Sequence, residues 1–175
     1  MKKKSPVVVI TGAARGIGYG IASCFAARKA TLVIADLDQK AADKAARELR
    51  SKGAAAAFGI ACDVAKRPSV ERMIAGAVKR FGRIDVLVNN AGICPFVDAM
   101  KLTPAIWQKT LDVNLTGAFH CTQVAAKQMI AQGDGGRVVF ITSLSENVTG
   151  PAQVDYAASK AGMSMTMRGF ATALG

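Results

Sequence analysis

Long apolar runs are missing from this sequence of 175 residues, and none reaches the roughly 18 residues that a membrane-spanning helix requires. The opening Met1-Lys2-Lys3-Lys4 is followed by a short apolar stretch, residues 7–10, which is too brief for a secretory signal peptide. Proline is scarce, and the 17 glycines show no three-residue period, which excludes collagen-like chains. With 51% apolar residues the chain can bury a sizeable core, and we expect one catalytic, dinucleotide-binding domain over residues 1–175, located in the cytoplasm.

Cysteine pairs are also missing. The four cysteines are widely spaced, and no C-x-x-C pair occurs among Cys24, Cys62, Cys94 and Cys121. This pattern disfavours a disulfide framework and a zinc site, so we expect buried reduced thiols and no bound metal.

Acidic residues are few: 12 Asp and Glu stand against 23 Lys and Arg, which gives a formal charge of +11. A basic chain can bind nucleic acid or an anionic membrane through its long-range field. The cations are scattered along predicted helices, however, so a solvated surface is the simpler interpretation. A nucleotide- or nucleic-acid-binding module without catalysis stays open as an alternative, and we expect no membrane partner.

Short apolar segments that alternate with longer helical patterns dominate the chain. The first four predicted strands start 24 to 28 residues apart, and the full set is Val7–Thr11, Thr31–Ala35, Ala57–Cys62, Asp85–Asn89 and Arg137–Thr142. The segments between them predict helices at Gly16–Lys29, Leu37–Lys52, Val70–Phe81, Pro104–Gln132 with a break near Gly117, and Val154–Leu174. Such a rhythm predicts a three-layer, doubly wound, Rossmann-like α/β fold with a parallel sheet in the order 3-2-1-4-5.

A glycine-rich turn follows the first predicted strand directly, in the run Thr11-Gly12-Ala13-Ala14-Arg15-Gly16-Ile17-Gly18. Glycines let the backbone approach a pyrophosphate, and the helix that follows offers free N–H groups to it. A turn that merely packs strand on helix would look similar. Asp36, at the end of the second strand, could accept hydrogen bonds from a ribose and repel a 2′-phosphate, or it could cap the next helix. We therefore expect NAD rather than NADP, although the cation of Arg15 points weakly toward NADP.

Ser143 and the pair Tyr156 and Lys160 form a candidate catalytic set. The tyrosine and the lysine are four residues apart in a predicted helix, so they share one face. A free phenol is a poor base at neutral pH, and a lysine charge about 4 Å away could stabilise a phenolate by roughly 4 kcal/mol at an effective dielectric near 20. Tyr-x-x-x-Lys spacing is common, and by itself it also fits an amphipathic helix.

Taken together, the motifs resemble the short-chain dehydrogenase/reductase family from about Val7 to Gly175. The resemblance rests on the glycine turn, Asp63-Val64, Asn89-Asn90-Ala91-Gly92, Val113-Asn114-Leu115, Ser143 and Tyr156-x-x-x-Lys160.

The resemblance implies hydride transfer between a nicotinamide cofactor and an alcohol or carbonyl carbon. Tyr156 would exchange the substrate proton, Ser143 would hold the substrate oxygen, Lys160 would bind the nicotinamide ribose, and Asn114 would anchor a proton-relay water. Cofactor contacts are implied for Gly12, Arg15, Gly16, Ile17, Gly18, Asp36, Asp63, Val64, Asn90, Ala91, Gly92, Tyr156 and Lys160. A homodimer or homotetramer is implied as well.

Three features depart from the family pattern, and the formal charge of +11 is one of them. Glu146 and Gln153 could hydrogen-bond several hydroxyls, which favours a sugar or polyol as the small-molecule substrate; a 3-oxoacyl thioester reductase is the alternative within the class. The fold type has six strands, and we place only five, so the sheet is expected to lack its last strands. We therefore expect little activity from this chain alone.

Overall fold

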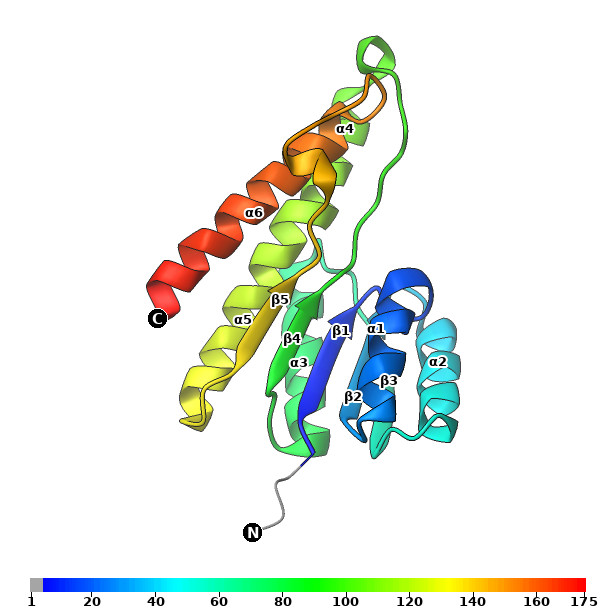
Figure 1. The fold of residues 1–175 in the computed structure, drawn as a ribbon, viewed down its shortest axis with the longest axis vertical. Coiled ribbons are helices and arrows are strands. Elements are labelled where there is room, and N and C mark those ends of the chain that lie inside the picture. Colours follow the sequence, from blue (N-terminus) through cyan, green and yellow to red (C-terminus); the bar gives the residue numbers. More distant parts are fainter. Residues whose placement is uncertain (1–4) are drawn as a thin grey trace.

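The computed structural model describes residues 5–175 and contains a five-stranded parallel sheet. The strands are β1 (Val7–Thr11), β2 (Thr31–Asp36), β3 (Ala56–Ala61), β4 (Val86–Asn89) and β5 (Arg137–Phe140). Their order is β3-β2-β1-β4-β5, which confirms the predicted topology (Figure 1). The central strands are almost wholly apolar because helices cover both of their faces.

Two apolar clusters lie on opposite faces of the sheet. One gathers Ile10 and Ile34 with the alanines of α1 (Gly16–Ala27) and α2 (Gln39–Ser51). The small alanine side chains let these two helices lie close to the strands.

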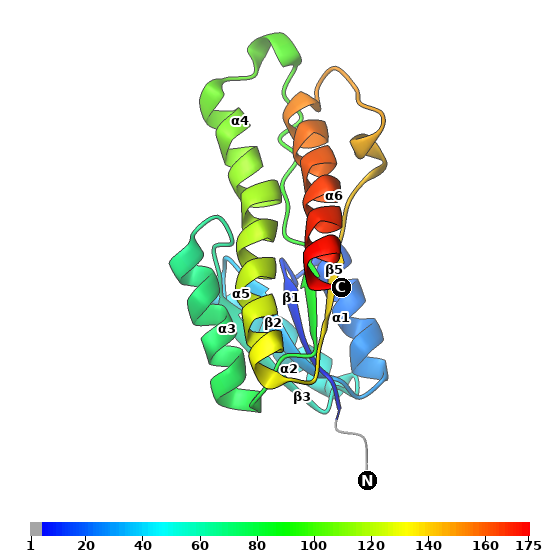
Figure 2. The same cartoon turned by 90° about the vertical axis from the view of Figure 1, so that its left-hand side faces the viewer.

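The second cluster packs Val9 and Leu87 against α3 (Arg67–Phe81) and α5 (Gly117–Gln132). The long α6 (Val154–Leu174) lies beside α5 and contacts β5 (Figure 2). The result is the expected three-layer arrangement, with the sheet between two helical layers.

Helix starts differ from the prediction at two places. The second helix begins at Gln39 because the carboxylate of Asp38 accepts hydrogen bonds from the N–H groups of Lys40 and Ala41, and Asp36 remains in β2. The third helix begins at Arg67 rather than Val70, since proline at position 68 is tolerated in a first helical turn.

The predicted break near Gly117 is a change of helix type. α4 (Pro104–Leu111) runs into a π-helical segment, η2 (Asp112–Thr116), which continues directly into α5. Such π segments are frequent at functional sites. Here the segment carries the buried Asn114.

An extension rises above the carboxyl ends of the strands (Figure 1). It comprises the segment between β4 and α4, with the short turn η1 (Ala99–Lys101), and the segment between β5 and α6, with η3 (Leu144–Glu146). The two segments join where the N–H of Ala99 donates to the carbonyl of Pro151 at 2.9 Å. Ligands bind at this end of parallel sheets.

The helices of residues 5–175 include none that is both long and apolar enough to cross a membrane. The thiols differ in burial: Cys62 and Cys121 are buried and Cys94 is half-buried, but Cys24 is exposed. The expectation of uniformly buried thiols is therefore wrong at Cys24, which lies on the outer face of α1.

Candidate active site

The turn between β1 and α1 needs its glycines for different reasons. Gly12 has φ +62°, and a Cβ atom there would lie 2.9 Å from the Cα of Ala91. Gly16 has φ +58° with no neighbouring atom within 4 Å of such a Cβ. Gly18 is buried, and its Cβ would lie 2.5 Å from the side-chain nitrogen of Asn90. Gly12 and Gly18 thus allow close packing, whereas Gly16 leaves open space.

The end of β4 holds this turn in place. The side-chain Nδ2 of Asn90 donates to the carbonyls of Thr11 at 2.8 Å and Gly12 at 3.1 Å. The hydroxyl of Thr11 accepts from the backbone N–H groups of Asn90 and Ala91, both at 3.1 Å. The asparagine therefore ties two strand ends together, and it lies at the wall of a cavity.

This cavity has a volume of about 340 Å³ and opens above the strands. Its lining contains most of the residues that the sequence predicts for a cofactor: Gly12, Arg15, Ile17, Asp36, Asp63, Val64, Asn90, Ala91 and Gly92. Sequence reasoning missed Leu37, Cys62, Ile93 and Val113, which also line it. Each of these four directly adjoins a predicted residue, so extending every motif by one position would have found them.

Two carboxylates in this cavity are held by backbone N–H groups. Asp36 does not cap the second helix; its Oδ2 accepts from the backbone N–H of Ala14 at 3.0 Å and so faces the glycine turn. Asp63 accepts from the N–H of Ala65 at 3.1 Å and pairs with Lys66 at 3.6 Å. Each carboxylate keeps acceptor capacity for a further donor.

Lys160 is buried, with 4% of its surface exposed, and no carboxylate in residues 5–175 pairs with it. Its Nζ donates to the carbonyl of Ile141 at 2.7 Å and lies 3.8 Å from the sulfur of Met163. Burial lowers the pKa of the Lys160 ammonium from its ordinary value, because desolvation disfavours the charged form. The same ammonium lies 5.7 Å from the centre of the Tyr156 ring.

Asn114 is fully buried in the π-helical segment, and its amide is held on all sides. Oδ1 accepts from the N–H of Ile93 at 2.8 Å, and Nδ2 donates to the Ile93 carbonyl and to the Ser159 hydroxyl, both at 2.9 Å. The side chain thus joins the segment after β4 to α6. A Cβ atom at Gly92 would lie 3.2 Å from Oδ1 of Asn114 and 3.7 Å from Nζ of Lys160.

The three residues predicted to touch substrate lie in the extension. Ser143 caps η3, which packs against α6, and its hydroxyl oxygen accepts from the N–H of Ser145 at 3.1 Å, so its proton is free to donate. Oε2 of Glu146 is buried with no hydrogen-bond partner among residues 5–175. Gln153 points its amide at the sulfur of Cys94, 3.7 Å away.

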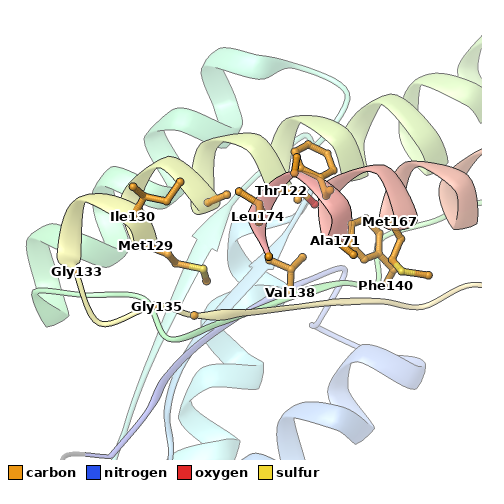
Figure 3. Close-up of a pocket in the computed structure, with 15 residues that line it drawn as sticks. Thr122, Met129, Ile130, Gly133, Gly135, Val138, Phe140, Met167, Ala171 and Leu174 are labelled. Carbon is orange, nitrogen blue, oxygen red and sulfur yellow. The ribbon is translucent and has the colours of Figure 1, made fainter.

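A larger, mainly apolar groove of about 710 Å³ lies elsewhere, between α5, β5 and the end of α6 (Figure 3). Met129, Val138, Phe140 and Met167 point into it. None of the predicted catalytic or cofactor residues lines this groove. The groove is therefore separate from the candidate active site.

Comparisons with known proteins agree with this geometry. A family model described as short chain dehydrogenase matches residues 6–175. The L-rhamnose 1-dehydrogenase (NAD(P)(+)) of Azotobacter vinelandii is 40% identical over 172 residues, covering 96% of this chain and 67% of that protein. The D-threitol dehydrogenase of Mycolicibacterium smegmatis is 39% identical, covering 90% and 60%, and the 3-oxoacyl-[acyl-carrier-protein] reductase of Synechocystis is 37% identical, covering 90% and 63%.

A solved structure, a short chain dehydrogenase from Mycobacterium smegmatis, matches with a TM-score of 0.94 at 31% identity, covering 98% of this chain and 72% of that one. The chain thus spans roughly two thirds of the length of the relatives it matches. By its family model, its relatives and its fold, the chain belongs to the short-chain dehydrogenase family.

Proposed function

We propose that this protein is an NAD-preferring oxidoreductase that transfers hydride between a nicotinamide cofactor and a CH–OH carbon of a sugar or polyol. One observation carries the proposal: the Lys160 ammonium lies 5.7 Å from the centre of the Tyr156 ring and 3.7 Å from the point where a Cβ atom of Gly92 would be, and Gly92 lines the 340 Å³ cavity. The pair that we propose to exchange protons therefore adjoins the cavity that we propose for the dinucleotide.

The residues around the cavity fit such a cofactor. No side chain among residues 5–175 caps the start of α1, so its first N–H groups are free to meet a pyrophosphate. The space beside Gly16 is open, and any side chain at that position would occupy room that a pyrophosphate could use. When bound, the nicotinamide would accept or supply the hydride.

The preference for NAD follows from Asp36, whose carboxylate would accept from a ribose hydroxyl and repel a 2′-phosphate. Arg15 lines the same cavity and would attract that phosphate, which opposes the preference. Asp36→Ala should therefore weaken NAD binding and favour NADP, and Arg15→Ala should do the reverse. Fluorescence titration with NADH and NADPH measures both, and equal changes for the two cofactors would contradict this assignment.

The side chains have distinct parts in the reaction. Tyr156 would exchange the proton of the substrate hydroxyl, and the nearby Lys160 charge would stabilise negative charge on the phenol oxygen. Ser143 would donate its free hydroxyl proton to the substrate oxygen. Asn114 would hold the Ile93 segment and α6 at the spacing that brings these groups to the cavity, and it would also anchor a proton-relay water.

A sugar or polyol substrate is supported by the extension and by two relatives. The unpaired, buried oxygen of Glu146 can accept a hydrogen bond from a hydroxyl, and the amide of Gln153 can donate one and accept another. L-rhamnose and D-threitol are the compounds printed in the names of two relatives. A 3-oxoacyl thioester substrate is the second candidate, since the Synechocystis relative is a reductase of that name.

The test compares the relative rates of turnover with each compound, because we expect only little activity from this chain alone. With NAD and NADH as the cofactor pair in both assays, we expect NADH formation from L-rhamnose or D-threitol to be faster than NADH oxidation with an acetoacetyl thioester, and the reverse ranking would favour the second candidate. Tyr156→Phe should abolish turnover and keep NADH binding. RNA binding that falls steeply with salt, together with no turnover, would favour the non-catalytic module.

Assembly and location remain predictions. A homodimer or homotetramer would use α4, α5 and α6, and sedimentation at micromolar concentration tests it. The cytoplasmic location rests on the cysteine pattern.

A further inference from the structure

Two buried polar pairs connect α6 with the helical segment that runs from α4 into η2. The Thr110 hydroxyl lies 2.6 Å from Oδ2 of Asp155, and Asn114 donates to the Ser159 hydroxyl at 2.9 Å. All four side chains are fully buried. Both pairs join residues 45 apart in sequence, so the two helices run in the same direction, as Figures 1 and 2 show. We call these two pairs, which are four residues apart on each helix, the polar ladder.

The polar ladder adjoins the proposed catalytic pair residue by residue. Asp155 directly precedes Tyr156, and Ser159 directly precedes Lys160. Successive residues of a helix point about 100° apart, so fixing the direction of the first member of each pair fixes the direction of the second. Ser159 also donates to the carbonyl of Tyr156 at 2.6 Å, which links the two turns.

Asp155 is the unusual member of the polar ladder. Its Oδ1 is buried and meets no donor within residues 5–175, and its Oδ2 has the Thr110 hydroxyl as partner. That hydroxyl also lies 3.1 Å from the carbonyl of Ile106, and its single proton can serve only one acceptor at a time.

Stability alone does not explain this arrangement. A half-paired buried carboxylate is more costly than an apolar side chain of similar size, even though the position of Asp155 in the first turn of α6 offsets part of that cost. Buried polar pairs of this kind can instead fix the register between helices, because any shift leaves both groups without partners.

We propose that Thr110 and Asp155 are positioning residues that set the rotation and the height of the first turns of α6, and thereby the place of the Tyr156 phenol relative to the cavity. This inference rests on the proposed role of Tyr156 for its catalytic consequence. Its structural part, the anchoring of α6 by the upper pair of the polar ladder, stands independently of turnover.

The test compares Thr110→Val with Thr122→Val. Both changes remove a buried threonine hydroxyl that pairs with one side chain, since Thr122 accepts from Asn89 at 2.9 Å, on α5 and outside the polar ladder. Amide hydrogen exchange of residues 157–160 is measured against residues 164–170 of the same helix. We expect Thr110→Val to speed exchange at 157–160 at least tenfold relative to 164–170, and Thr122→Val to leave that ratio within twofold.

Turnover provides the second readout. Thr110→Val should lower kcat at least tenfold and change KM for cofactor and substrate by no more than about twofold. The single variants Thr110→Ser and Asp155→Asn, which keep a hydrogen bond between the two positions, should retain most of the wild-type kcat. Unchanged exchange ratios in folded Thr110→Val would overturn the proposal, as would losses in kcat equal to those of Thr122→Val.

If Thr110→Val does not fold, Asp155→Leu tests the same anchoring. Leucine removes both the hydrogen bond to Thr110 and the buried carboxylate that would otherwise lose its partner. The variant should fold and show the same faster exchange and lower kcat; wild-type exchange and kcat in Asp155→Leu would overturn the proposal. If Tyr156→Phe retains the turnover of the parent chain, the proposed function fails while the exchange ratio, which needs no turnover, still decides the anchoring.

Discussion

Replacing three glycines near the start of α1 by alanine, one at a time, separates three energetic effects at one end of the molecule. Gly12 combines φ +62° with a close backbone neighbour, and Gly16 has φ +58° with open space around it. Gly20 lies inside α1 without positive φ and also has open space around it. The three variants therefore share a chemical change and differ only in local geometry.

The expected free energies of unfolding follow from this geometry. Gly20→Ala should stabilise the protein by about 0.5–1 kcal/mol, because alanine loses less backbone entropy in a helix. Gly16→Ala should destabilise it by roughly 1–2 kcal/mol, the cost of a left-handed backbone for an L-residue. Gly12→Ala adds contact at 2.9 Å with the Cα of Ala91, which must move and strain the two Asn90 hydrogen bonds, each worth about 1 kcal/mol, for a total of roughly 3–4 kcal/mol.

Urea unfolding without cofactor, followed by the fluorescence of the only tryptophan, Trp107, and by circular dichroism, measures these differences. The expected order of stability is Gly20→Ala, wild type, Gly16→Ala, Gly12→Ala, with unchanged dependence on urea concentration. Equal stability of the Gly12 and Gly16 variants would refute the argument from close approach. Wild-type stability of Gly16→Ala would refute the argument from backbone strain.

Two further predictions concern the buried groups Lys160 and Cys62, and a third concerns the half-buried Asn90. In the unfolded chain Lys160 stays protonated up to about pH 10.5, whereas burial lowers the pKa of its ammonium in the folded state. Lys160→Met should therefore be more stable than wild type at pH 7, by a margin that shrinks as the pH rises toward 10.5. Urea unfolding curves at several pH values measure this margin, and a margin that stays constant would contradict the prediction. Burial raises the pKa of the Cys62 thiol to about 11. Iodoacetamide at pH 8 should therefore label the exposed Cys24 rapidly and label Cys62 only after the protein unfolds. Peptide mass mapping measures both labelling rates, and equal rates would argue against the burial of Cys62. Asn90→Ala should lower the free energy of unfolding by about 1–3 kcal/mol and weaken NADH binding, because the carbonyls of Thr11 and Gly12 lose their donor. Calorimetry measures both effects. Loss of binding with no loss of stability would show that Asn90 contacts the cofactor and does not stabilise the turn.

Local chemistry explains which parts of the fold were predictable. The strands were predictable as short apolar segments, because a parallel sheet that is covered on both faces has no polar side. The sequence Ala35-Asp36-Leu37-Asp38 contains two aspartates, and composition cannot decide which one caps the helix. The answer depends on the tertiary hydrogen bond between Asp36 and the N–H of Ala14, 22 residues earlier.

The candidate site shows the same division. Motif residues predicted most of the cavity wall, since a glycine turn and strand ends must meet at one edge of the sheet. The π-helical turn was predictable only as a break, because it accompanies a bond between Asn114 and Ile93, which are 21 residues apart. The pairing of Thr110 with Asp155 spans 45 residues and has no sequence signal.

The polar ladder also bears on where this half of the protein can tolerate insertions and deletions. Residues can be gained or lost in the turn between Gln132 and Arg137, which joins α5 to β5, without altering which side chains meet across the two helices. An added residue between Thr110 and Asn114, or between Asp155 and Ser159, would turn everything beyond it by about 100° and separate one pair. Length variation should therefore be confined to the loops, and the four-residue spacings on both helices should persist in functional variants of this protein.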